Sequence, residues 1–98
     1  MLEREVEQYV VNYAVQRGVL VLKLNTTGNR GWPDRVFLFE RGRVLFIEFK
    51  APNARPRRDE VLQKHVAENL RRKGYMVEWC ANKEYGKELI DQHLKQRR

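Results

Sequence analysis

The sequence has little of what marks a secreted or membrane-bound protein. It contains one cysteine, Cys80, which excludes an internal disulfide. No positively charged segment followed by an apolar one opens the chain, so we expect no secretion. Apolar runs such as Val44 to Ile47 are far shorter than the roughly 20 residues that span a bilayer. We therefore expect a cytoplasmic protein with no membrane as partner.

The chain also lacks an internal repeat, a low-complexity tract and a linker. Its 98 residues allow one compact domain and no more. Hydrophobic residues make up 42% of the chain, which is enough for a single core. We therefore expect residues 1–98 to form one folded domain.

Acidic residues are fewer than basic ones, 13 against 20, and the formal net charge is +7. A positive charge this dense indicates a polyanionic partner, most often nucleic acid. Composition leaves open whether this partner is DNA, RNA or an acidic membrane surface, and whether the protein is an enzyme or a passive binder.

The hydrophobic pattern predicts an α/β domain. On a helical wheel, the apolar residues of the first segment fall on one face, and Gly18 ends the pattern. Helices are predicted over 2–17, 57–73 and 83–95, and strands over 19–24, 36–39, 44–49 and 75–79. The second helix has a predicted apolar stripe of Leu62, Val66 and Leu70. The order αβββαβα fits a three-stranded meander and a helical crossover to a fourth strand.

The second and third predicted strands are joined by a short turn that contains Gly42. If residues 40–42 form a three-residue loop with this glycine in the left-handed conformation, Asp34 faces Glu48 across the two strands. A two-residue loop would place these acids on opposite faces of the sheet. The predicted site therefore depends on the length of the turn.

Two interpretations of these acids remain open. In the first, Glu48 and Lys50 form an ordinary ion pair at a strand end, and Asp34 begins a turn after Pro33. In the second, Asp34 and Glu48 are oxygen ligands of a divalent cation, and Lys50 lies next to bound water or a scissile phosphate. Two opposed carboxylates repel each other, so something positive should lie between them.

The first predicted helix carries another acid near its apolar face. Glu3 lies at the edge of this face, whereas Glu5 points away and Glu7 is intermediate. One explanation is that Glu3 interacts favourably with the helix dipole in the first turn. The other is that Glu3 reaches Asp34 and Glu48 as a third acidic group.

The segments Gly31-Trp32-Pro33-Asp34 and Glu48-Phe49-Lys50 together resemble the signature of the PD-(D/E)XK nucleases. The glutamate-bearing first helix and the later helix with Gln63 resemble the VRR-Nuc branch of these enzymes. The similarity spans the chain from Glu3 to about Trp79. Two features depart from the family pattern: Val66 stands where an aromatic residue often follows the glutamine, and Glu7 competes with Glu3 for the helix position.

The resemblance implies a restriction-endonuclease-like fold, an αβββαβ core with a mixed four-stranded sheet flanked by helices. It implies DNA phosphodiester hydrolysis that depends on Mg²⁺ or Mn²⁺. Asp34, Glu48 and the carbonyl of Phe49 would bind the metal, Lys50 would be the catalytic lysine, and Glu3 and Gln63 would be accessory catalytic residues. Small members of this kind are similar to Holliday-junction resolvases that act as homodimers on branched DNA. The expected setting is a bacterial or phage-infected cell, near the nucleoid.

Basic side chains near the predicted site are candidates for contact with DNA phosphates, which would give affinity without base specificity. This candidate set comprises Arg30, Arg35, Arg55, Arg57 and Arg58. Trp32 is predicted either to stack on an exposed base or to pack under its loop, and packing is favoured. Two rival functions remain: a nickase or flap-type nuclease in a repair or replication assembly, and a non-catalytic basic module that binds nucleic acid.

Overall fold

A computed structural model describes residues 2–24, 28–52 and 59–95. The helices are α1 (Glu3–Val15), α2 (Glu60–Arg72) and α3 (Lys83–Lys95), and the strands are β1 (Leu20–Lys23), β2 (Arg35–Leu38), β3 (Val44–Phe49) and β4 (Met76–Cys80). The sheet order is β1-β2-β3-β4, and β4 is parallel to β3 whereas the other neighbours are antiparallel. This confirms the predicted meander with a helical crossover.

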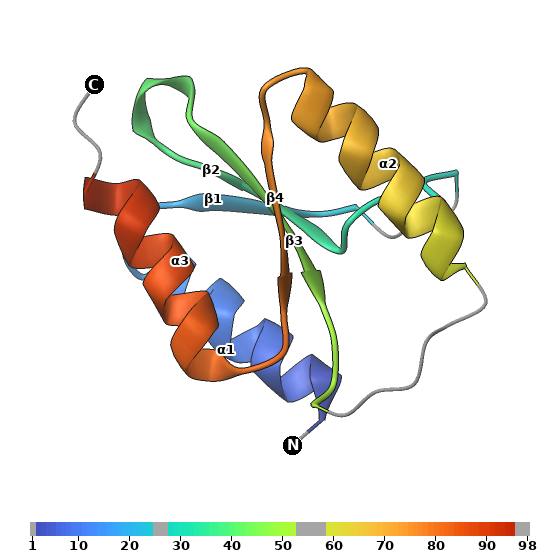
Figure 1. The fold of residues 1–98 in the computed structure, drawn as a ribbon. Coiled ribbons are helices and arrows are strands. Elements are labelled where there is room, and N and C mark those ends of the chain that lie inside the picture. Colours follow the sequence, from blue (N-terminus) through green and yellow to red (C-terminus); the bar gives the residue numbers. More distant parts are fainter. Residues whose placement is uncertain (1, 25–27, 53–58, 96–98) are drawn as a thin grey trace.

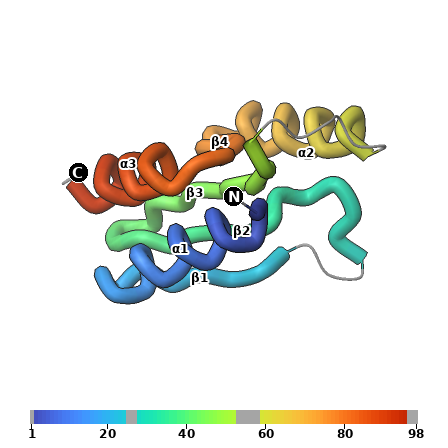
Figure 2. The backbone as a smooth tube through the Cα atoms, turned by 90° about the horizontal axis from the view of Figure 1, so that it is seen from below, coloured from blue at the N-terminus to red at the C-terminus, as the bar shows by residue number. Residues whose placement is uncertain are grey.

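The helices cover the two faces of the sheet unequally (Figure 1). Helices α1 and α3 pack together on one face, and α2 lies on the other (Figure 2). The larger core cluster joins α1 and α3 to the sheet through side chains such as Phe37, Leu45 and Ile47. A smaller cluster under α2 includes Phe46, Ala67 and Leu70. Because both faces of β3 are covered, this strand is apolar along almost its whole length.

The turn between β2 and β3 has the predicted register. Residues Glu40–Gly42 form a single 3₁₀ turn, and Gly42 has a φ of 74°. Val36 lies opposite Phe46, so the residues that follow in each direction, Asp34 and Glu48, lie on the same face. Arg41 also has a positive φ, 64°, a conformation that non-glycine residues adopt rarely.

The side of helix α2 that faces the sheet differs from the predicted one. Leu62 and Val66 are only partly buried, whereas Gln63, Ala67 and Leu70 are fully buried. The predicted stripe of Leu62, Val66 and Leu70 was therefore partly wrong. The physical reason is that Gln63 makes hydrogen bonds to Glu48 of β3 and to Lys50, which directly follows this strand, and these bonds draw a polar residue to the sheet.

None of the helices within 2–24, 28–52 and 59–95 has the length and apolar character needed to cross a membrane.

Candidate active site

Two buried carboxylates lie side by side at one end of the central strands. Asp34 directly precedes β2 and is 5% exposed, and Glu48 near the end of β3 is 2% exposed. Both project from the sheet face that α2 covers, because they continue the rows of Val36 and Phe46. A buried carboxylate is costly unless it is paired or binds a cation. The fold therefore holds two carboxylates together in a place that is shielded from water, where they need protein donors or a cation to stabilise their charge.

The Asp34 carboxylate is fixed by a backbone donor. Its Oδ2 accepts a hydrogen bond of 2.8 Å from the N–H of Phe49, which lies 15 positions further along the chain. The backbone N–H of Leu24 donates to the carbonyl oxygen of Asp34 over 2.8 Å. These two bonds tie Asp34 to β3 and to the end of β1. The side chain is therefore oriented before any ligand binds.

Gln63 of α2 connects the charged groups of Glu48 and Lys50. Its Nε2 donates to Glu48 Oε2 over 3.0 Å, and its Oε1 accepts from Lys50 Nζ over 2.9 Å. The Lys50 ammonium is 3.6 Å from the same Glu48 oxygen. The amide thus uses its donor end for the acid and its acceptor end for the base. Lysine, glutamine and glutamate form one continuous hydrogen-bonded row.

The donor set fits a hard divalent cation. Mg²⁺ is bound by one or two carboxylates, keeps several water ligands and prefers oxygen. Asp34 and Glu48 supply two carboxylates, and Phe49 lies between them and Lys50 in the chain. Oε1 of Glu48 is buried and accepts no hydrogen bond within the described part of the chain. Across 2–24, 28–52 and 59–95, no three Asp, Glu, His or Cys side chains are grouped to hold an ion. Such an ion would therefore rely on two carboxylates, a backbone carbonyl and water.

The accessory acids of α1 differ in their surroundings. Glu7 forms an ion pair of 2.7 Å with Arg35 at the start of β2. Glu3 is half-buried in the first turn of α1, which lies beside the end of β3 in both views of the backbone (Figures 1 and 2). The structure does not gather Glu3 with Asp34 and Glu48 into one three-acid cluster of described residues. The role of Glu3 stays a prediction.

The predicted DNA contacts are only partly described. Arg30 is exposed, whereas the guanidinium of Arg35 is paired with Glu7. Trp32 is 38% exposed, and its ring meets the edge of Phe46 with 6.2 Å between ring centroids. Packing and partial exposure thus coexist at Trp32. The remaining three candidates, Arg55, Arg57 and Arg58, lie outside the described residues.

The loop before Asp34 is closely fitted to α2. Gly31 has a φ of 83°, and a Cβ at this position would collide with the side chain of Leu62. A glycine therefore meets two requirements here, a left-handed backbone and a close approach to the helix. This contact fixes the loop that leads into Asp34 against the helix that supplies Gln63.

Two features of the site were missed in the sequence. The bridging position of Gln63 between Lys50 and Glu48 depends on the docking of α2, which no local pattern reveals. The other feature is Trp79, whose Cα is paired with that of Glu48 in the parallel β3–β4 ladder. The sequence shows a tryptophan in a short predicted strand, but it does not show the register that places this residue beside Glu48.

Two known proteins are similar to this chain, one in part of its sequence and one in its fold. No family model matches the sequence. A curated protein described as "Putative nuclease p44", from Acyrthosiphon pisum secondary endosymbiont phage 1, is 33% identical over 54 residues. The match covers 55% of this chain and 58% of the phage protein, so the chain spans little more than half of that relative.

A solved structure described as a "VRR_NUC domain" matches nearly the whole fold. It superposes with a TM-score of 0.77 at 28% sequence identity, covering 93% of this chain and 96% of that one. The mixed four-stranded sheet and its three helices therefore have the arrangement of that domain. The chain therefore resembles a VRR-Nuc domain in fold and, over part of its sequence, a phage protein described as a putative nuclease.

Proposed function

We propose that the protein is a metal-dependent nuclease that hydrolyses phosphodiester bonds of DNA. The observation that carries this proposal is the row of Asp34, Glu48 and Lys50, held on one sheet face by Phe49 N–H and Gln63. The name of the phage relative, a putative nuclease, supports the same activity. The net charge of +7 supports a polyanionic substrate.

Hydrolysis of a phosphodiester requires neutralisation of the phosphate oxygens, activation of water and stabilisation of the leaving oxygen. Asp34 and Glu48 would hold Mg²⁺ or Mn²⁺ with the Phe49 carbonyl, and such an ion supplies charge neutralisation and water activation when bound. Lys50 adds a positive charge at the same place. Gln63 orients this ammonium, which either binds a phosphate oxygen or positions the attacking water.

Metal binding tests the proposal directly. Calorimetric titration of Mg²⁺ and Mn²⁺ into the protein should show binding that Asp34→Asn and Glu48→Gln abolish. Glu40→Gln, which changes an exposed acid in the β2–β3 turn, is the matched control and should bind metal like the parent. Unchanged DNA affinity without any metal uptake would instead support the non-catalytic binding module.

The preferred DNA structure forms the finer part of the proposal. We infer that the substrate is a four-way junction, with a flap or a nicked duplex as the rival. Cleavage of a junction, a flap and a linear duplex should be compared in Mg²⁺, each repeated with Lys50→Ala. Equal cleavage of all three substrates would contradict junction specificity, and no cleavage of any would contradict the nuclease itself.

A homodimer is the proposed assembly. Leu20 and Leu22 on the edge strand β1 are 67% and 57% exposed and project from the same face of the sheet. Apolar side chains on an open sheet edge favour pairing with a second copy. Light scattering should show a dimer that Leu22→Lys converts to a monomer, whereas Val15→Lys, at the exposed end of α1, should leave it intact. A monomeric parent protein would contradict the dimer.

A further inference from the structure

A second tryptophan lies next to the proposed catalytic strand and has no role in the function proposed above. Trp79 of β4 is the direct neighbour of Glu48 in the parallel ladder. Directly paired residues project from the same face, and neighbouring strands lie about 4.8 Å apart. The indole therefore begins one strand away from a buried carboxylate of the site, under the same helix.

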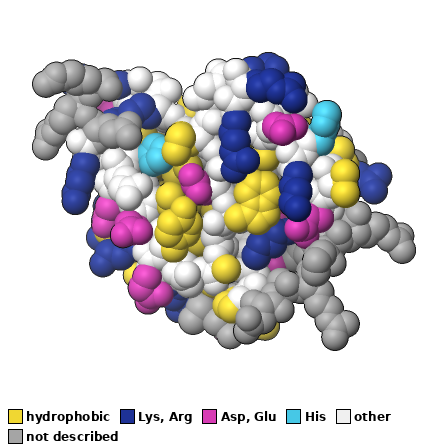
Figure 3. Space-filling view, viewed as in Figure 1, with side chains coloured by type: hydrophobic (Ala, Val, Ile, Leu, Met, Phe, Trp, Pro, Cys, Tyr) yellow, Lys and Arg dark blue, Asp and Glu magenta, His cyan; other side chains and the backbone are white. Residues whose placement is uncertain are grey.

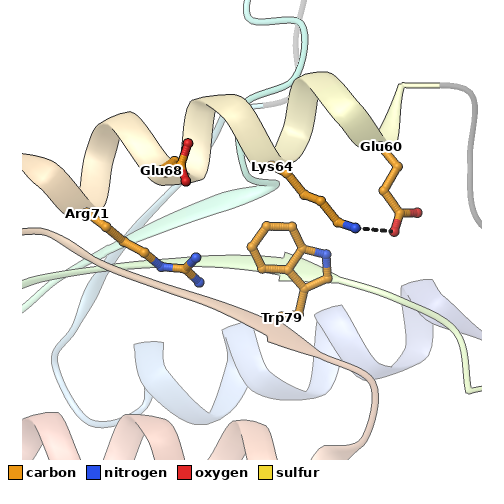
Figure 4. A pocket seen from close by; sticks show the side chains of 5 residues that line it. All are labelled: Glu60, Lys64, Glu68, Arg71 and Trp79. Carbon is orange, nitrogen blue, oxygen red and sulfur yellow. Dashed lines mark ion pairs between the residues drawn. The ribbon is translucent and has the colours of Figure 1, made fainter.

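The ring of Trp79 forms one wall of a hollow of about 470 Å³ between α2 and β4. Glu60, Lys64, Glu68 and Arg71 line the rest of it, and all four come from α2 (Figure 4). Their spacing of three or four residues places them on one side of the helix. In Figure 4 the indole lies between the side chains of Lys64 and Arg71. The surrounding surface is a hydrophobic area bordered by charges of both signs (Figure 3).

One charged side chain at this hollow, Arg71, is held in place by the backbone of β4. Arg71 donates to the carbonyl oxygen of Val77 over 2.6 Å, and its Cζ is 5.7 Å from the centroid of the indole ring. Lys64 is 3.8 Å from Glu60. Trp79 itself packs partly against the core cluster beneath α2. The ring is therefore supported by the core beneath it and bordered on one side by the fixed guanidinium of Arg71.

The chemistry of the lining favours a neutral aromatic ligand with polar edges. Two cations and two acids balance each other, so the hollow has no net attraction for a phosphate group. Indole faces stack on nucleobases of every kind, and carboxylates accept hydrogen bonds from the amino groups that bases carry on their edges. A nucleobase has both properties.

We propose that Trp79 and its hollow bind a nucleobase that is unstacked from the DNA next to the phosphate at Asp34 and Glu48. This inference rests on the proposed function and deepens it, because it assigns the substrate class. A base leaves the stack cheaply where it is already unpaired, at a bulge, a junction or a flap. Preference for irregular DNA would then come from this hollow.

The test measures binding without metal, so that it is independent of cleavage. Fluorescence anisotropy compares a duplex with one unpaired base and the same duplex with an abasic residue at that position. The parent protein should bind the base-containing duplex more tightly by roughly five- to hundredfold, the effect of one stacked base. Trp79→Ala should bind both duplexes equally, whereas Tyr9→Ala, which removes an exposed aromatic ring of α1 on the other face of the sheet, should keep the discrimination.

A second measurement applies even if Trp79→Ala does not fold. The chain contains two tryptophans, so Trp32→Phe leaves Trp79 as the only one. Its fluorescence should be quenched by the base-containing duplex and not by the abasic duplex. Equal affinity of the parent for both duplexes, or equal quenching by both, would overturn the inference. Cleavage with Mg²⁺ is scored separately, so a cleaving protein that ignores the base would refute this subsite and leave the nuclease proposal standing.

Discussion

At the scale of single residues, the site depends on a side chain that carries no charge. Gln63 is buried and offers one amide end to Glu48 and the other to Lys50. Without the amide, the glutamate oxygen would lose its neutral donor and the ammonium would lose its acceptor. Residues that orient ligands in this way commonly change metal affinity or activity by about 10- to 100-fold when they are replaced.

We expect Gln63→Ala to weaken Mg²⁺ binding by about 10- to 100-fold and to lower the free energy of unfolding by about 1–3 kcal/mol, because Glu48 Oε2 stays buried without this donor. Calorimetry and urea unfolding measure the two effects. Gln92→Ala, which truncates an exposed glutamine on α3, should change neither quantity. Full metal affinity in Gln63→Ala would show that the amide does not organise the site.

Some of these residue contacts were predictable, and others were not. Asp34, Glu48 and Lys50 could be placed on one face because the turn before β3 fixes the register locally. The ion pair between Glu7 and Arg35 joins residues 28 positions apart on different elements. A wheel diagram of α1 contains no information about β2, so it could only mark Glu7 as intermediate.

At the scale of elements, the packing of α1 against α3 requires a residue without a side chain. Gly86 of α3 is buried, and a Cβ there would collide with the Val10 side chain of α1. The two helices therefore approach more closely than an alanine would allow. A glycine inside a helix costs about 1 kcal/mol relative to alanine, so the close contact must offset this cost.

Gly86→Ala should lower the free energy of unfolding by about 1–2 kcal/mol, because overpacking of a close helix contact outweighs the gain in helix propensity. Urea denaturation with an unchanged m-value is the appropriate measurement. Glu88→Ala, two residues along on the exposed side, should have little effect. A more stable Gly86→Ala protein would mean that α1 shifts to accommodate the methyl group without loss.

Some properties of the helices and strands follow from local sequence patterns, and others do not. The α3 boundaries and the sheet order follow from local apolar patterns and one glycine turn, and both were predicted. The orientation of α2 was not, because Leu62 and Val66 look like better core residues than Gln63. The helix turned Gln63 inward because β3 supplies partners for its amide, which is a property of the assembled sheet.

At the scale of the whole molecule, the excess of positive charge should govern how DNA binds. Each phosphate contact releases counterions, so affinity should fall steeply as salt rises. Arg30 is exposed near the loop that leads to Asp34, whereas Arg35 already neutralises Glu7. The two arginines therefore differ in how freely they are available to DNA.

We expect Arg30→Ala to reduce the slope of log affinity against log salt concentration by about one. Arg35→Ala should reduce it less, because this guanidinium is already engaged within the protein. Anisotropy titrations from low to physiological salt give both slopes. Equal loss of slope in the two variants would show that the Glu7–Arg35 pair opens when DNA binds.

The fit of Leu62 over Gly31 means that opening the loop and lifting the helix are one event rather than two. The apolar support beneath α2 is narrow, with only Ala67 and Leu70 of this helix fully buried beside Gln63. Any excursion that detaches α2 would admit water to both carboxylates at once. The rate at which the amide protons of α2 exchange with solvent would then report how often α2 detaches and the site opens.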